Sequence, residues 1–248
     1  MSLHSAIKRT SLILLLSIVA FVLFERAAFA EEETMVLDSE AAVLIDAASG
    51  DVLYEKNSQQ SMYPASITKI ITGIIAIEQG ELDDIVTISE NATEADGTSV
   101  YLLEDEQMTL RQLVQGLLIN SGNDAATAIA EHMDGSEAAF AERMNQFVEE
   151  HVEQPSTTFS NPHGLFAKDH QTNAYEMALL TRYALENDTF RKIVATKEME
   201  WVGEVGRRHC LIIIDCFGIM KGQPALRTVL FPNQALRSSR PPKEKKWN

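Results

Sequence analysis

The sequence predicts a mixed α/β domain of the α+β kind, in which an antiparallel sheet packs beside a cluster of helices. Two observations carry this prediction. Two short β-prone runs at 42–46 and 51–55 flank a turn and indicate a hairpin. An apolar run at 66–78 and several later segments with helical periodicity indicate a buried helix within a helical cluster. A strand pair beside such a cluster is typical of mixed domains.

Residues 1–30 have the pattern of a secretory signal peptide. Lys8 and Arg9 form a charged region, residues 11–24 are apolar, and Ala28 to Ala30 offer a cleavage site of small residues. An uncleaved membrane anchor is the alternative because the apolar run is long, but the cleavage site and the acidic run after it favour removal. We therefore expect an exported protein that begins near Glu31, and membrane association stays open.

The mature chain opens with the predicted hairpin, whose turn is 47–50. Pro64 and Ala65 then lead into the helix predicted at 66–78, which is apolar nearly all round and is closed by Gly80. A helix of that kind is expected to be buried at the centre of the domain.

Shorter patterns predict the remaining elements. Thr109 to Gln112 form a capping box, which predicts the start of an amphipathic helix that runs to about Leu118. A turn at 120–123 separates it from the next helix. The other predictions are a strand at 85–88 and helices at 124–133, 137–152 and 173–185.

Charge is distributed unevenly along the chain, whose formal net charge is −15. Residues 31–202 hold nine Lys or Arg against 32 Asp or Glu, whereas residues 203–248 hold nine against three. An acidic body repels nucleic acid and anionic lipid, so these partners are disfavoured.

The cysteines exclude a disulfide framework, because Cys210 and Cys216 are the only two and both lie near the C-terminal end. A bridge between them and two buried thiols are both compatible with the pattern. With two cysteines and no tight histidine cluster, metal-ligand spacing is absent, and we predict no metal and no cofactor.

Ser66 and Lys69 are the first candidates for chemistry. The serine opens the buried helix directly after Pro64 and Ala65, and the spacing of three places Lys69 on the same face one turn on. A serine hydroxyl becomes a good nucleophile when a base takes its proton, which lysine can do only as the neutral amine. The surrounding isoleucines supply the desolvation that lowers a lysine pKa. A surface lysine on an ordinary helix does not fit these neighbours.

Ser121, Gly122 and Asn123 form the second element, in a turn between two predicted helices. There a hydroxyl and an amide can project into a cleft. In isolation the triplet is typical of a turn in which Asn123 caps the next helix. Together with Ser66 and Lys69, it predicts two further site residues, Ser121 and Asn123.

With these motifs in place, the sequence resembles the serine-type D-Ala-D-Ala carboxypeptidases, low-mass penicillin-binding proteins related to class A β-lactamases. The resemblance covers about residues 40–202, and its matching stretches are 63–69 (YPASITK), 121–126 (SGNDAA), 161–165 (NPHGL) and 173–178 (NAYEMA). It implies a β-lactamase/transpeptidase-like catalytic domain at 31–202 and a hydrolase of peptidoglycan maturation in the cell-envelope space.

The resemblance also implies roles. Ser66 would attack the carbonyl between two D-alanines of a peptidoglycan stem peptide, Lys69 would accept its proton, and water would release the shortened peptide from the acyl-enzyme. Ser121 would relay a proton to the leaving amine, and Asn123 would position Lys69 and the substrate amide. The Ser66 N–H would be one oxyanion donor. β-Lactam antibiotics are then expected as covalent inhibitors.

The last part of the chain departs from the family. In the family, a Lys-Thr/Ser-Gly triplet holds the substrate carboxylate, and the strand that carries it supplies the second oxyanion N–H. This triplet is absent after Trp201, where only Lys221-Gly222 resembles part of it. Charge, cysteine and proline content all change near residue 203. We therefore interpret 203–248 as an atypical tail, replaced or read from a shifted frame, with a strand at 210–216, a poorly ordered end and an incomplete sheet.

Alternative functions stay open. The missing triplet favours a defective fragment that binds cell-wall peptide weakly or not at all. A β-lactamase needs a carboxylate that activates water, and the loop at 155–173 shows no such signature. A Ser-His-Asp triad through His163 is disfavoured because no nucleophile elbow surrounds Ser66. We expect His163 in a structural loop and the other histidines of the mature chain at surface or packing positions: His132, His151, His170 and His209.

Overall fold

The structure is a computed structural model that describes residues 37–196, 198–203, 206–211, 217–218 and 226–230. The predicted signal peptide, Cys216, Lys221-Gly222 and the end of the tail lie outside these residues. Within the described part of the chain, no helix has the length and apolar character needed to cross a membrane.

The largest sheet has four antiparallel strands in the order β2-β1-β8-β7. β1 (Ala42–Asp46) and β2 (Val52–Lys56) form the predicted hairpin, which is confirmed to within a residue. The other edge of β1 pairs along its whole length with β8 (Leu226–Leu230), which in turn pairs with the two-residue β7 (Phe217–Gly218).

Part of the atypical tail takes part in this open sheet. Residues after 203 contribute β7 and β8 to the main sheet, so the tail does not leave β1 without a second partner. Of the strand predicted at 210–216, residues 210–211 belong to β6 (Gly206–Leu211), which pairs with β5 (Glu198–Gly203), and residues 212–216 lie outside the described part. The pairing of Gly203 with Gly206 makes a tight hairpin that sets this register, which periodicity alone does not reveal.

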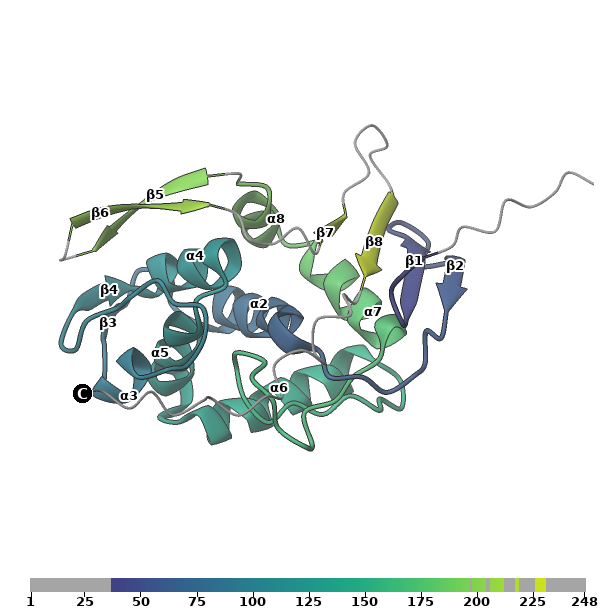
Figure 1. Cartoon of the computed structure of the whole chain (residues 1–248), viewed down its shortest axis with the longest axis horizontal. Helices are drawn as coiled ribbons and strands as arrows, with labels where there is room; N and C mark the ends of the chain where they lie inside the picture. The colour runs from purple at the N-terminus through teal and green to yellow at the C-terminus, as the bar shows by residue number, and fades with distance from the viewer. Residues whose placement is uncertain (1–36, 197, 204–205, 212–216, 219–225, 231–248) are drawn as a thin grey trace, which may run out of the picture. The chain divides into compact units, whose positions relative to one another are not determined.

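The predicted central helix begins as a 3₁₀ turn, η1 (Ala65–Thr68), and continues as α2 (Lys69–Gln79). Every residue from Lys69 to Ala76 is buried. α2 contacts α4, α5, α6, α7 and α8 and lies amid these helices in Figure 1. Gly73 allows the close approach of α4, because a methyl group there would lie 2.8 Å from a methyl carbon of Leu118.

The helices around α2 follow the predicted periodicity. At the start of α4 both bonds of the predicted capping box are present, since Thr109 and Gln112 each accept from the other's backbone N–H. α7 packs on β1 and β8 and so covers the sheet. The surrounding helices are α4 (Leu110–Asn120), α5 (Asn123–Asp134), α6 (Glu137–His151), α7 (Ala174–Ala184) and α8 (Asp188–Val194).

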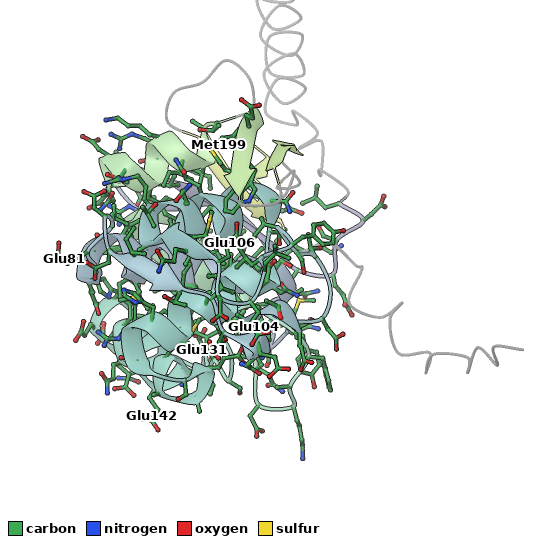
Figure 2. All side chains as sticks on the ribbon, turned by 90° about the vertical axis from the view of Figure 1, so that its left-hand side faces the viewer. Glu81, Glu104, Glu106, Glu131, Glu142 and Met199 are labelled. Carbon is green, nitrogen blue, oxygen red and sulfur yellow. The ribbon has the colours of Figure 1, made fainter. Side chains whose placement is uncertain are left out.

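Three short elements besides α8 complete the described fold: β3 (Ile85–Thr87), α3 (Glu90–Thr93) and β4 (Gln107–Thr109). The hairpin β5–β6 is anchored on α4 by Trp201, whose side chain is 4% exposed. The Trp201 ring packs directly on Gly116 of α4, because a methyl group added to this glycine would lie 2.8 Å from the ring. Acidic side chains such as Glu81 and Glu142 are exposed and point outward in Figure 2, as the acidic composition requires.

Candidate active site

Ser66 and Lys69 are in contact, as their spacing predicts. Ser66 lies in η1 and Lys69 is the first residue of α2, and a 3₁₀ turn places residues three apart directly above one another. The Lys69 Nζ is 3.3 Å from the Ser66 Oγ. Ser66 is exposed, whereas the Lys69 side chain is buried with 2% of the residue exposed. The Ser66 hydroxyl therefore faces solvent and the Lys69 amine lies beneath it.

The turn that presents Ser66 is held in an unusual backbone conformation. Ala65 has a φ of 51°, in the left-handed region that an alanine rarely adopts. Gly164, with a φ of +86°, packs directly against it: a methyl group on Gly164 would lie 1.9 Å from the Ala65 carbonyl oxygen. Only glycine fits there, so the loop around Gly164 supports the turn that exposes the nucleophile.

Burial tunes Lys69 for proton transfer. Desolvation lowers the pKa of Lys69 from 10.5 to about 7, while the negative charge of Asp124 raises it. Asp124 is itself buried and is occupied by the backbone N–H groups of Val100, Leu102 and Ala125. At neutral pH a large fraction of Lys69 is therefore the neutral amine that a base requires. The predicted cause, desolvation, is confirmed.

The second partner of Lys69 was not predicted. Its Nζ donates a 2.7 Å hydrogen bond to the backbone carbonyl of His163. The preceding carbonyl, that of Pro162, accepts a 2.6 Å bond from Thr72 one turn further along α2. The loop at 161–165 therefore lies along the N-terminal end of α2 and closes one side of the site.

Ser121 and Asn123 lie at the junction of α4 and α5, both of which pack on α2. Ser121 has a left-handed φ of 60°, and among the described residues its hydroxyl has no hydrogen-bond partner. Within the described residues that hydroxyl is thus not engaged, and the proton relay that the resemblance implies for Ser121 stays a prediction.

The Asn123 carboxamide is engaged differently from the role that the resemblance implies. Its Nδ2 donates to the Asp96 carbonyl at 2.5 Å, and its backbone N–H donates to Thr98. Within the described part of the chain, no hydrogen bond joins Asn123 to Lys69. Gly97 passes so close that a methyl group there would lie 2.7 Å from the Asn123 Nδ2. In this structure Asn123 anchors the loop at 96–98 beside the site, and substrate binding by Asn123 stays a prediction.

The other histidines make structural contacts. His170 is buried between the Thr68 hydroxyl, 2.8 Å from Nε2, and the Ser160 N–H, 3.0 Å from Nδ1. Burial, followed by the charge of His163, lowers the pKa of His170 to about 4, so this ring is neutral at physiological pH. His151 stacks on Phe147. His132 meets Asp84 at 3.4 Å, and the side chain of His209 lies outside the described part.

Two further features of the described residues bear on the chemistry. They contain no group of three or more His, Cys, Asp or Glu side chains suited to a metal ion. A pocket of about 120 Å³ lies between the end of β1 and α7, lined by residues such as Ile45, Thr181 and Arg182, and none of the proposed site residues lines it. This pocket is therefore separate from the contact between Ser66 and Lys69.

Known proteins resemble this chain in sequence and in fold. A family model described as D-alanyl-D-alanine carboxypeptidase, peptidase family S11, matches residues 27–207. The D-alanyl-D-alanine carboxypeptidase DacF of Bacillus subtilis is 36% identical over 185 residues, which are 71% of this chain and 47% of the relative. The chain spans about half the length of the curated relatives it matches.

Solved structures agree on the fold. The D-alanyl-D-alanine carboxypeptidase DacD from Francisella tularensis is 35% identical with a TM-score of 0.64, covering 68% of this chain and 42% of that one. Penicillin-binding protein 6B from Escherichia coli is 25% identical with a TM-score of 0.70, covering 84% and 75%. The predicted transpeptidase-like fold is confirmed, and the chain belongs to the D-alanyl-D-alanine carboxypeptidase family.

Proposed function

We propose that this chain is a serine-type D-Ala-D-Ala carboxypeptidase that removes the terminal D-alanine of peptidoglycan stem peptides through an acyl-enzyme on Ser66. The observation that carries the proposal is the contact between an exposed serine hydroxyl and a buried lysine whose pKa is lowered to about 7. Family membership adds the substrate class, because the matching relatives are named for this activity.

In the first half-reaction, the neutral Lys69 amine takes the Ser66 proton as Oγ attacks the carbonyl carbon of the D-Ala-D-Ala bond. Ser66 is in the first turn of a helix, where backbone N–H groups lack intrahelical partners, so its N–H is available to the developing oxyanion. The carbon–nitrogen bond then breaks. The proton held by Lys69 passes to the leaving amine, with the free Ser121 hydroxyl as its relay, and D-alanine departs.

In the second half-reaction, water attacks the ester carbonyl while Lys69 accepts a proton from it. The ester bond breaks, the proton returns to Ser66 Oγ, and the shortened peptide is released as a carboxylic acid that loses its remaining proton to solvent. A β-lactam carries a strained amide that Ser66 would open in the same way, and because its acyl-enzyme retains the amine, we expect a stable label.

A β-lactamase remains the nearest rival, and the carboxylates in and after the loop at 155–173 argue against it. Asp169, in the loop before α7, is exposed. Glu176 is buried, but its oxygens accept from the backbone and hydroxyl groups of Ser156 and Thr157 and from the Asn173 amide. Burial alone would raise its pKa, yet these hydrogen bonds outweigh it and lower the pKa. Glu176 therefore uses its oxygens to hold the loop at 155–173 in place.

The test combines covalent labelling with product release. The protein is incubated with a fluorescent penicillin and, separately, with a peptide ending in D-Ala-D-Ala, with Ser66→Ala as the control. Stable label and D-alanine release by the wild type alone support the carboxypeptidase. Rapid turnover of penicillin would favour the β-lactamase, and folded protein without label would favour the defective fragment that the missing triplet suggests.

We also propose that residues 1–30 direct export and are removed near Glu31, on the sequence pattern described above. Expression of the full chain in a bacterial host, followed by N-terminal sequencing of the mature product, tests this. Protein that keeps residues 1–30 and stays with the membrane would contradict it.

A further inference from the structure

The direction of the Lys69 amine depends on the His163 carbonyl. A neutral amine has two hydrogens and one lone pair. Because one N–H of Lys69 is donated to the His163 carbonyl at 2.7 Å, the lone pair is free to turn toward the Ser66 hydroxyl at 3.3 Å. Displacement of that carbonyl would leave the amine without its orienting acceptor.

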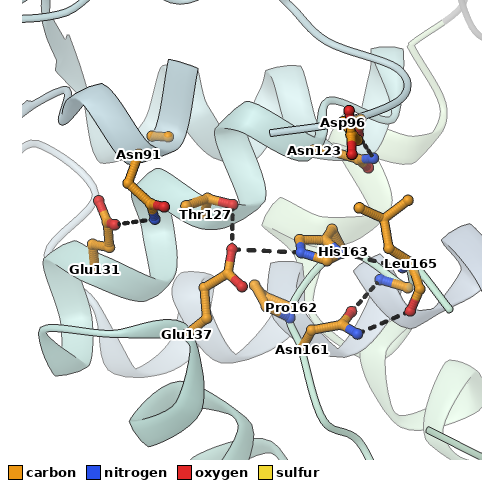
Figure 3. A network of polar contacts seen from close by, with 12 residues as sticks. Asn91, Asp96, Asn123, Thr127, Glu131, Glu137, Asn161, Pro162, His163 and Leu165 are labelled. Atoms are coloured by element: carbon orange, nitrogen blue, oxygen red, sulfur yellow. Dashed lines mark hydrogen bonds and ion pairs between the residues drawn. The ribbon is translucent and has the colours of Figure 1, made fainter. Parts of the chain in front are cut away.

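The loop that carries this carbonyl is held by its own hydrogen bonds. The Asn161 carboxamide accepts from the Gly164 N–H at 2.7 Å and donates to the Leu165 carbonyl at 2.9 Å (Figure 3). The His163 ring adds a third bond, since its Nδ1 accepts the Leu165 N–H at 3.1 Å. Nδ1 therefore carries no proton, and the neutral ring has its proton on Nε2.

The Nε2 side of the His163 ring faces a carboxylate from another part of the fold. Glu137 begins α6, and its Oε1 is 3.4 Å from Nε2 (Figure 3). The same oxygen accepts a 2.5 Å bond from Thr127 of α5. The hydrogen bond from His163, with that from Thr127, outweighs burial and lowers the pKa of Glu137, so it stays a carboxylate near neutral pH. The histidine ring thus ties the loop to the α5–α6 junction.

We propose that Glu137 and His163 are positioning residues that hold the His163 carbonyl against Lys69 and keep Lys69 shielded from water and aimed at Ser66. This rests on the proposed function, in which Lys69 is the base. Neither side chain touches the reacting atoms. Their effect passes through the loop at 161–165, whose Gly164 also supports the Ser66 turn.

The charged groups around this network determine how loss of the Glu137 carboxyl would change the pKa of Lys69. Asp124 acts on Lys69 through its charge, His163 acts in the same way on His170, and Glu137 contacts Nε2 of the His163 ring. Removing the Glu137 carboxyl leaves Asp124 in place and His170 neutral. The main change is then that the loop at 161–165 loosens and water gains access to Lys69. Since burial is what lowers its pKa, the pKa of Lys69 should rise toward 10.5.

The test measures acylation by fluorescent penicillin from pH 5.5 to 9.5 in the wild type and in Glu137→Ala. We expect the midpoint of the rate profile to rise by about one unit or more, which lowers the rate at pH 7 about fivefold or more and leaves the alkaline plateau within about twofold. Glu137→Gln keeps an oxygen acceptor for Nε2 and should move the midpoint back toward the wild type. A structural defect alone would lower the rate equally at every pH.

Glu131→Gln is the matched control, because Glu131 is a carboxylate of α5 bound to Ser89 and Asn91 (Figure 3), with no contact to His163 in the described part of the chain. It should leave the profile unchanged. If Glu137→Ala does not fold, Thr127→Val removes one anchor of Glu137 and should shift the midpoint in the same direction by less.

A second readout does not depend on activity. The ¹³Cε resonance of Lys69, assigned by its loss in Lys69→Met, titrates with the amine and should show the same rise in Glu137→Ala. If the wild type takes up no label, the proposed function fails while this titration still tests the network. An unchanged Lys69 midpoint in folded Glu137→Ala or, where that variant does not fold, in Thr127→Val overturns the inference.

Discussion

Replacement of Gly164 by alanine tests how the site is supported. The added methyl group would lie 1.9 Å from the Ala65 carbonyl oxygen and 2.9 Å from the Thr68 hydroxyl. To restore ordinary contact, the turn before Ser66 must move by more than 1 Å, a displacement that can cost about 100-fold in rate. The φ of +86° adds about 1–2 kcal/mol of left-handed strain to the cost of the clash.

Gly135→Ala separates these two costs. Gly135 also has a positive φ, +76°, but a methyl group there would meet nothing within 4 Å. Urea unfolding should therefore show that the free energy of unfolding falls by about 1–2 kcal/mol in Gly135→Ala and by clearly more in Gly164→Ala. Penicillin labelling should slow about 100-fold in Gly164→Ala alone. Equal stability losses, or labelling of Gly164→Ala at the wild-type rate, would refute the buttressing role of the loop.

Three further substitutions follow from the burial of particular side chains. Lys69→Met should abolish acylation yet stabilise the protein by about 2 kcal/mol at pH 6. The lowered pKa means that the buried cation destabilises the fold most below about pH 7 and progressively less as the pH rises to 10.5. Urea unfolding at pH 6 and pH 10 that shows equal gains in the free energy of unfolding would contradict this. Thr181→Val should raise stability by about 1 kcal/mol, because this buried hydroxyl has no partner among the described residues, and a drop in the thermal midpoint would argue for a hidden one. Trp201→Ala should cost about 3–5 kcal/mol in chemical denaturation, and a loss below 1 kcal/mol would mean that the β5–β6 hairpin is not anchored on α4.

Local signals account for the parts of the fold that were predictable. The hairpin at β1–β2, the apolar helix α2 and the capping box at Thr109 each depend on residues within one short segment. The pairing of β1 with β8 joins residues 180 or more positions apart, and its register comes from tertiary packing that no local pattern encodes. Helices α3 and α8 are too short for periodicity to identify them.

The site likewise contains features that the local sequence predicts and features that it does not. The contact between Ser66 and Lys69 and the direction of the lysine pKa followed from spacing and apolar neighbours. The His163 carbonyl was missed because a backbone acceptor leaves no residue-type signature, although the Asn-Pro-His-Gly-Leu motif marked the loop that supplies it. Glu137 was missed because its partner lies across the fold.

The central claim is that a neutral Lys69 is the base for Ser66, and the pH dependence of acylation tests it most directly. The rate of penicillin labelling of the wild type should rise with pH through one midpoint near 7, where Lys69 loses its proton, and then level off. A rate that does not change with pH, or a midpoint near 10.5 as for an ordinary lysine, would contradict the account.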